Sequence, residues 1–136
     1  MHGAEGEAGL LRAATLAAQE IEAWFQPVVN LHTKEVLGFE CLARWTDAEL
    51  GEVSPAVFIP LAEQAGFIDA LTKQLFAKAI ACARHWPDTV FLSFNLSSVQ
   101  LVDPTTALAV LLMLEKMEFD PRRIKIEITE TAMMSD

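Results

Sequence analysis

The sequence predicts an α/β fold in which parallel strands alternate with helices. After two initial extended segments, the apolar residues recur at helical spacing and in β-rich runs, in the order helix, strand, helix, strand. Such alternation is typical of parallel strands joined by crossover helices. The chain has 136 residues, of which 52% are hydrophobic and 21% are charged. This composition suits one folded domain and excludes a disordered chain, a collagen-like repeat and a coiled coil.

The first third of the chain is predicted to hold a tail, a helix and a pair of strands. Residues 1–9 are small, polar and glycine-rich, which is typical of a flexible tail or linker. Apolar side chains then recur at helical spacing up to Ile21 and predict a helix. Residues 24–29 and 35–45 are β-rich runs separated by a polar turn, so they predict a hairpin or two neighbouring strands.

The remaining elements are predicted from capping residues and periodicity. Ser54-Pro55 supplies the N-cap and first residue of a helix, and Gly66 is its expected stop. Asp69 is a candidate cap for the next helix. That helix is predicted to end at Pro87. The elements predicted after it are a strand over residues 90–96, a helix opened by Asp103-Pro104 and a strand over residues 124–129.

Charge and cysteine content limit the partners and the compartment. Acidic residues outnumber basic ones 19 to 10, and the net charge of −9 argues against binding a nucleic-acid polymer. Cys41 and Cys82 make no disulfide framework and lack metal-site spacing, so we expect two buried thiols in a reducing compartment. No segment approaches the roughly 20 apolar residues of a membrane span, and the start does not resemble a signal peptide. We therefore expect a cytoplasmic protein, or a cytoplasmic piece of a larger one.

Alternation along three predicted strands places oxygen-bearing side chains on one face of each strand. Glu40, Leu42 and Arg44 share one face, and Asn95 and Glu127 occupy the corresponding faces of the next two strands. In α/β folds the carboxyl ends of parallel strands carry the active site. Two carboxylates and an amide oxygen suit a hard cation such as Mg²⁺ or Mn²⁺. The Arg44 guanidinium suits a bidentate contact with a phosphate.

A structural role is the alternative interpretation of the same residues. In that interpretation Glu40 and Arg44 form an ion pair within the sheet, and Asn95 caps the turn at Ser97. Because three strands repeat the same arrangement, the functional interpretation is favoured.

At these residues the sequence resembles the EAL domain family, the bacterial phosphodiesterases for cyclic di-GMP. The signature Glu-Ala-Leu appears as Glu40-Cys41-Leu42, with Cys41 in place of alanine on the predicted apolar face, where a small thiol is tolerated. The resemblance covers about residues 10–131. The other matching motifs are Phe25-Gln26-Pro27-Val28-Val29, Phe58-Ile59-Pro60-Leu61-Ala62-Glu63, Asn95-Leu96-Ser97 and Glu127-Ile128-Thr129-Glu130.

The resemblance implies a partial TIM-like (β/α) barrel with one antiparallel strand, about half of the full EAL barrel. Complete TIM barrels need about 250 residues, so residues 10–136 would form the N-terminal half of an EAL-type domain after the tail over residues 1–9. The family's later motifs, which include an Asp pair and a Lys near the water, have no counterpart up to Asp136. The general base is therefore expected beyond Asp136, and the chain alone is expected to show little or no hydrolysis.

The resemblance also implies roles for individual residues. The implied metal ligands are Glu40, Asn95 and Glu127. The implied contacts with the dinucleotide are Gln26, Leu42 and Arg44. Glu130 would steady a loop near the metals and the dimer surface.

The implied reaction is hydrolysis of cyclic di-GMP to linear pGpG by water that two divalent ions, Mg²⁺ or Mn²⁺, activate. The expected partners are cyclic di-GMP and a second copy, in a homodimer or swapped dimer within a multidomain sensor or cyclase protein. One alternative is a non-catalytic module that binds cyclic di-GMP or a protein, and another is a degenerate remnant with a structural role only.

Overall fold

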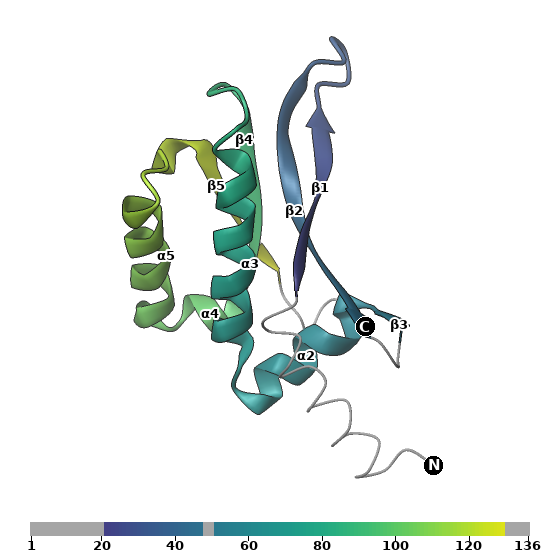
Figure 1. The fold of residues 1–136 in the computed structure, drawn as a ribbon, viewed down its shortest axis with the longest axis vertical. Helices are drawn as coiled ribbons and strands as arrows, with labels where there is room; N and C mark the ends of the chain where they lie inside the picture. Colours follow the sequence, from purple (N-terminus) through teal and green to yellow (C-terminus); the bar gives the residue numbers. More distant parts are fainter. Residues whose placement is uncertain (1–20, 48–50, 130–136) are drawn as a thin grey trace.

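The computed structural model describes residues 21–47 and 51–129, which form a mixed sheet with helices packed against it (Figure 1). The predicted tail over residues 1–9, the predicted helix before Ile21 and Glu130 lie outside these ranges. The strands are β1 (Glu22–Val29), β2 (Val36–Asp47), β3 (Gly51–Val53), β4 (Phe91–Ser97) and β5 (Ile124–Thr129). The helices are α2 (Pro55–Ala65), α3 (Ile68–Ala83), α4 (Ser98–Leu101), α5 (Pro104–Lys116) and the 3-10 turn Pro121–Arg123.

The sheet has the order β1-β2-β4-β5, and β3 pairs with the end of β2. β1 runs antiparallel to β2, whereas β2, β4 and β5 are parallel to one another. The predicted hairpin is confirmed, and its turn is held by Asn30, whose Oδ1 accepts hydrogen bonds from the backbone of His32 and Thr33. β3 and α4 were not predicted, because each is too short to show a periodic pattern.

The pairing of β2 with β4 is short, and this opens the sheet. It runs only from Gly38 opposite Phe91 to Glu40 opposite Ser93. A Cβ atom at position 38 would lie 2.4 Å from the Phe91 ring, so glycine is required where the strands approach closely. Beyond Glu40, β2 leaves β4 and pairs with β3 instead, so the carboxyl halves of β2 and β4 diverge (Figure 1).

Local capping explains where α2 begins and ends. The Ser54 Oγ accepts a hydrogen bond from the Ala56 N–H at 3.2 Å, and Pro55 follows as the first helical residue. Gly66 adopts the left-handed conformation with φ of 82°, so the predicted stop is confirmed. Asp69, by contrast, is not a cap, because α3 begins at Ile68 after Phe67 and places Asp69 inside its first turn.

The other helix ends follow the same chemistry with small shifts. α3 ends at Ala83, before Pro87, and α5 begins after Asp103, whose Oδ1 accepts a hydrogen bond from the Thr105 N–H at 2.9 Å. α5 ends at Lys116, ahead of Pro121. None of the helices in the described ranges combines the length and apolar character needed to cross a membrane.

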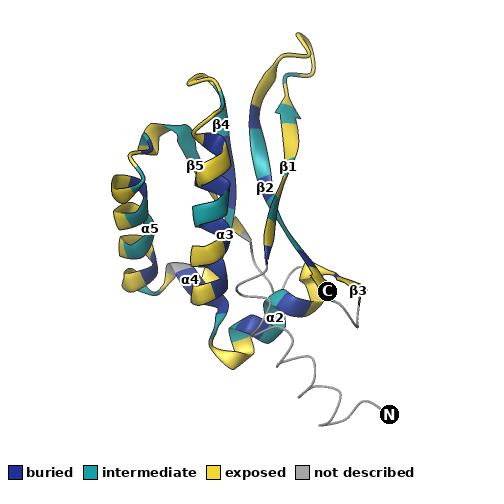
Figure 2. Ribbon diagram, in the orientation of Figure 1, coloured by how far each residue is buried: buried dark blue, intermediate teal, exposed yellow. Residues whose placement is uncertain are grey.

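The core lies between the sheet and the helices α2 and α3 (Figure 2). The Phe94 ring of β4 meets the Phe76 ring of α3 edge to face, with centroids 4.9 Å apart. Trp45 at the end of β2 meets Phe58 of α2 in the same way at 5.7 Å. Burial of each such side chain contributes about 1.5–3 kcal/mol, so this face of the sheet carries much of the stability.

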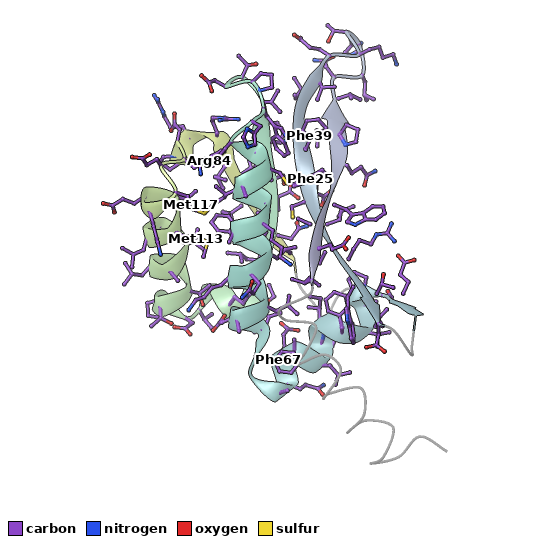
Figure 3. The ribbon with its side chains drawn as sticks, viewed as in Figure 1. Phe25, Phe39, Phe67, Arg84, Met113 and Met117 are labelled. Atoms are coloured by element: carbon purple, nitrogen blue, oxygen red, sulfur yellow. The ribbon has the colours of Figure 1, made fainter. Side chains whose placement is uncertain are left out.

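Aromatic rings from the middle of the hairpin extend this core. Phe25 and Phe39 sit between the hairpin and α3 (Figure 3), with ring centroids 5.0 and 4.8 Å from that of Trp86. Met113 of α5 and Met117, which follows the end of α5, lie between that helix and α3 (Figure 3). These contacts fix α3 against the sheet and α5 against α3.

The two thiols differ in their surroundings. Cys41 is 3% exposed on the helix-facing side of β2, which confirms its predicted place on the apolar face. Cys82 is exposed on α3, so the prediction of two buried thiols is wrong for that residue. Both cysteines are free.

Candidate functional site

A cavity of about 430 Å³ opens where the carboxyl halves of β2 and β4 diverge. Glu40, Asn95 and Glu127, the three predicted metal ligands, all contribute to its wall. The rest of the wall comes from β2, β4, α4 and the inner sides of α2 and α3. The gap in the sheet therefore gives the polar face of the strands a concave surface that is closed from behind by helices.

The predicted ligands are brought together by strand register. Asn95 lies directly opposite Glu127 in the parallel pair of β4 and β5. The Asn95 Nδ2 donates a hydrogen bond of 3.2 Å to the Glu40 Oε2 across the gap between β4 and β2. Glu40 and Asn95 are half-buried, whereas Glu127 is exposed at the edge of the described sheet. One carboxylate on each side of an amide forms a continuous row of oxygen-bearing side chains.

The contacts of these residues differ from those of the structural interpretation. Arg44 forms its ion pair with Glu52 of β3, and Glu40 instead accepts the hydrogen bond from Asn95. The turn after β4 is capped by Ser97, whose Oγ accepts a hydrogen bond from the Gln100 N–H at 3.4 Å, so Asn95 is not needed there.

The donor set fits a hard divalent cation. Within residues 21–47 and 51–129, no three His, Cys, Asp or Glu side chains are placed to hold a metal ion together. The row on these strands instead combines two carboxylates with the Asn95 amide. Carboxylate and amide oxygens are the ligands that Mg²⁺ and Mn²⁺ prefer. Ser93, on the same face and opposite Glu40, has a buried Oγ without a hydrogen-bond partner in the part of the chain that the structure describes. A bound ion or water beside the carboxylate would give this buried hydroxyl a partner.

The neighbouring Cys41 thiol is chemically quiet. Burial, and secondarily the negative charges of Cys82 and Glu40, raise the pKa of the Cys41 thiol to about 12. At neutral pH the thiol is therefore protonated and serves as a small apolar side chain rather than as a thiolate ligand.

The three predicted dinucleotide contacts lie on one face of the hairpin. Gln26 is opposite Glu40 in the register of β1 and β2, and Arg44 is opposite Glu22, with Leu42 between them on β2. Leu42 contributes to the cavity wall, whereas Gln26 and Arg44 extend the same face beyond it over the surface of the hairpin. A ligand that spans this face reaches from the carboxylates to the guanidinium.

Sequence reasoning missed two residues near the site. The Trp24 ring lies 4.4 Å from the Arg44 guanidinium carbon and is 51% exposed on the same face. The available signal was that Trp24 lies two residues before Gln26 and so shares its face of β1. Gln100 was also missed, because its role depends on contacts with α3 that no local pattern reveals.

Gln100 ties the end of β4 to α3. Its Oε1 accepts a hydrogen bond from the Ser97 N–H at 3.2 Å, while its Nε2 donates to Thr72 at 2.8 Å and to Asp69 at 3.3 Å. The side chain is 4% exposed, so each of these bonds is shielded from water. The amide thereby fixes the turn that follows the strand of Asn95.

The curated proteins that resemble this chain include proteins named as cyclic di-GMP phosphodiesterases. A Pseudomonas aeruginosa cyclic di-GMP phosphodiesterase, RocR, is 33% identical over 119 residues, which are 85% of this chain and 30% of RocR. The probable cyclic di-GMP phosphodiesterase PdeI of Escherichia coli is 34% identical over 115 residues, which are 80% of this chain and 15% of PdeI. The chain thus spans less than a third of the length of these curated relatives.

Solved structures match the fold over almost the whole chain. The PaMucR phosphodiesterase in complex with c-di-GMP superimposes with a TM-score of 0.81 at 28% identity, over 94% of this chain and 53% of that one. The EAL enzyme Bd1971 with bound cAMP and cyclic di-GMP gives a TM-score of 0.79 at 26% identity, over 96% of this chain and 39% of that one. The predicted partial TIM-like barrel is therefore confirmed. Because the family model for the EAL domain matches residues 9–136, the chain belongs to the EAL domain family.

Proposed function

We propose that this chain is the N-terminal half of an EAL domain that binds cyclic di-GMP, and that the complete protein hydrolyses it to linear pGpG. The observation that carries the proposal is the convergence of Glu40, Asn95 and Glu127 on one cavity, beside a face that presents Arg44. The relatives that are named as cyclic di-GMP phosphodiesterases support the choice of ligand and reaction.

In this proposal Glu40, Asn95 and Glu127 hold divalent cations, Mg²⁺ or Mn²⁺, of which the complete domain binds two. Such ions supply a nucleophile at neutral pH and neutralise charge on the phosphate. The protein's part is to keep three oxygen donors in one row, which the Asn95–Glu40 hydrogen bond and the register of Asn95 with Glu127 favour. The row also explains how a chain with a net charge of −9 attracts an anion, because bound cations reverse the local field.

The hairpin face supplies the remaining contacts. The Arg44 guanidinium binds a phosphate of the dinucleotide through two parallel N–H donors, while Gln26 and Leu42 contact the neighbouring part of the ligand. Arg44 is already paired with Glu52, so a phosphate must compete with that carboxylate. The Arg44 and Glu52 side chains are 41% and 58% exposed, and an ion pair this accessible exchanges partners at low cost.

The wider context is proposed from the same observations. Residues 1–9 act as a linker from another domain of a cytoplasmic multidomain sensor or cyclase protein, which the greater length of the relatives supports. Glu130 would steady a loop at the site. A homodimer or swapped dimer is favoured by exposed apolar side chains on the outward side of α5 and on β5, which are Leu108, Leu111, Leu112, Ile126 and Ile128.

The test is calorimetric titration of the 136-residue chain with cyclic di-GMP in the presence of Mg²⁺ or Mn²⁺. Binding is expected for the wild type and is expected to disappear in Glu40→Ala, while Glu35→Ala in the hairpin turn serves as the matched control. Binding that survives Glu40→Ala unchanged would defeat the metal-site assignment. We also expect little or no release of pGpG by this chain, because three ligands do not complete two octahedral metal sites. Ordinary turnover with Mn²⁺ would overturn that expectation and the proposed division of the domain.

A further inference from the structure

A half-exposed tryptophan stands in the middle of the hairpin face. In the register of β1 and β2, Trp24 lies directly opposite Leu42, and the flanking pairs are Gln26 with Glu40 and Glu22 with Arg44. Trp24 is therefore surrounded by the proposed dinucleotide contacts Gln26, Leu42 and Arg44. The 51% exposure of its side chain contrasts with the 1% exposure of Trp45, which is a core residue.

The indole of Trp24 is held in one orientation although it is not buried. Its Nε1 donates a hydrogen bond of 3.1 Å to the Glu22 Oε2. The guanidinium carbon of Arg44 lies 4.4 Å from its ring centroid, which is within cation–π range. A fixed aromatic ring with an open surface loses little conformational entropy when a flat ligand group packs on it.

We propose that Trp24 is a stacking surface for a guanine base of the dinucleotide, with Arg44 taking the adjacent phosphate; this inference rests on the proposed binding of cyclic di-GMP. Stacking of a base on an aromatic side chain is worth about 1–3 kcal/mol by alanine substitution, and an adjacent guanidinium adds to it. The arrangement joins the two chemical parts of a nucleotide: a planar base on the indole and an anion on the guanidinium. Leu42, opposite Trp24, extends the apolar surface toward the cavity.

A purely supporting role for Trp24 makes different predictions. If the indole served only to orient Arg44, its effect on binding would vanish once the cation over its ring was replaced by an uncharged side chain. If it stacks a base, its effect persists in that background, because the two contacts are then independent. A cycle of Trp24→Leu and Arg44→Gln separates the two roles, since leucine keeps apolar bulk without a π-face and glutamine leaves no cation for the ring to orient.

The experiment is calorimetric titration of cyclic di-GMP with Mg²⁺ into the full chain and its variants. Trp24→Leu is expected to weaken binding about tenfold or more, which is the low to middle part of the stacking range. Trp24→Phe is expected to keep most of the wild-type affinity, and Trp86→Phe is the matched control, because Trp86 packs on Phe25 and Phe39 on the opposite face of the hairpin. The loss caused by Trp24→Leu is expected to be equally large in the Arg44→Gln background.

Fluorescence gives a second readout that a structural role would not move. Cyclic di-GMP is expected to quench the emission of the wild type through Trp24, while Trp24→Phe binds without that quenching. Unchanged affinity in Trp24→Leu, or a loss that disappears in Arg44→Gln, overturns the stacking role while the proposed function stands. Failure of the wild type to bind cyclic di-GMP overturns both.

Discussion

The two faces of the sheet are made by alternate residues of the same strands, yet they differ in what they do. Toward α3, β4 presents Leu92, Phe94 and Leu96, none of which is more than 3% exposed. On the other face it presents Ser93 and Asn95. The Ser93 hydroxyl is buried without a hydrogen-bond partner among the described residues, and the Asn95 amide donates a hydrogen bond to the Glu40 carboxylate on the neighbouring strand. One face is optimised for packing, whereas the other keeps polar groups where they cost stability.

Two adjacent residues of β4 can therefore differ in role, because one stabilises the fold and the next belongs to the functional face. A residue directed at α3 contributes through burial, and its neighbour contributes through donor atoms. Substitutions at adjacent positions should therefore have opposite signatures in stability and in binding. The three predictions below test that separation.

The largest expected effect is on the packed face. Phe94→Ala removes a ring that is 1% exposed and stacked edge to face on Phe76, so it should lower the free energy of unfolding by about 3–5 kcal/mol. Asn95→Ala, one residue away, should change that free energy by about 1 kcal/mol while abolishing binding of cyclic di-GMP with Mg²⁺. Urea denaturation and calorimetry measure the two quantities. Equal losses of stability in both variants would show that the faces are not separable.

An intermediate effect is expected where the two faces meet. Gln100→Ala leaves the Ser97 N–H and the Thr72 hydroxyl without their buried partner, so unfolding should become easier by about 1–3 kcal/mol. The turn after β4 should also loosen, which weakens binding through Asn95. Gln74→Ala on the exposed side of α3 is the control, and no loss is expected there. A variant of Gln100 that loses stability but keeps full affinity would confine its role to folding.

Much of this division was predictable from the sequence, because alternation and capping are local. The face of Glu40 and Arg44, the row of Glu40, Asn95 and Glu127, and the stop at Gly66 follow from spacing within single elements. The pairing of Arg44 with Glu52 was missed, because β3 has three residues and its place depends on how β2 bends away from β4. Contacts between elements distant in sequence are set by packing, and no periodicity encodes them.

The smallest expected effect concerns that unpredicted ion pair on the functional face. Glu52→Gln keeps the shape of the side chain but removes the charge that competes with phosphate for Arg44, so binding of cyclic di-GMP should tighten by up to a few-fold. The free energy of unfolding should change by less than about 1 kcal/mol, because both side chains are accessible to solvent. Calorimetry at low and high salt measures the effect, which should shrink as salt screens the carboxylate, and Glu35→Gln is the control for net charge. Weaker binding in Glu52→Gln would instead mean that Glu52 holds Arg44 in its binding position, so that the functional face, like the packed one, depends on its own internal contacts.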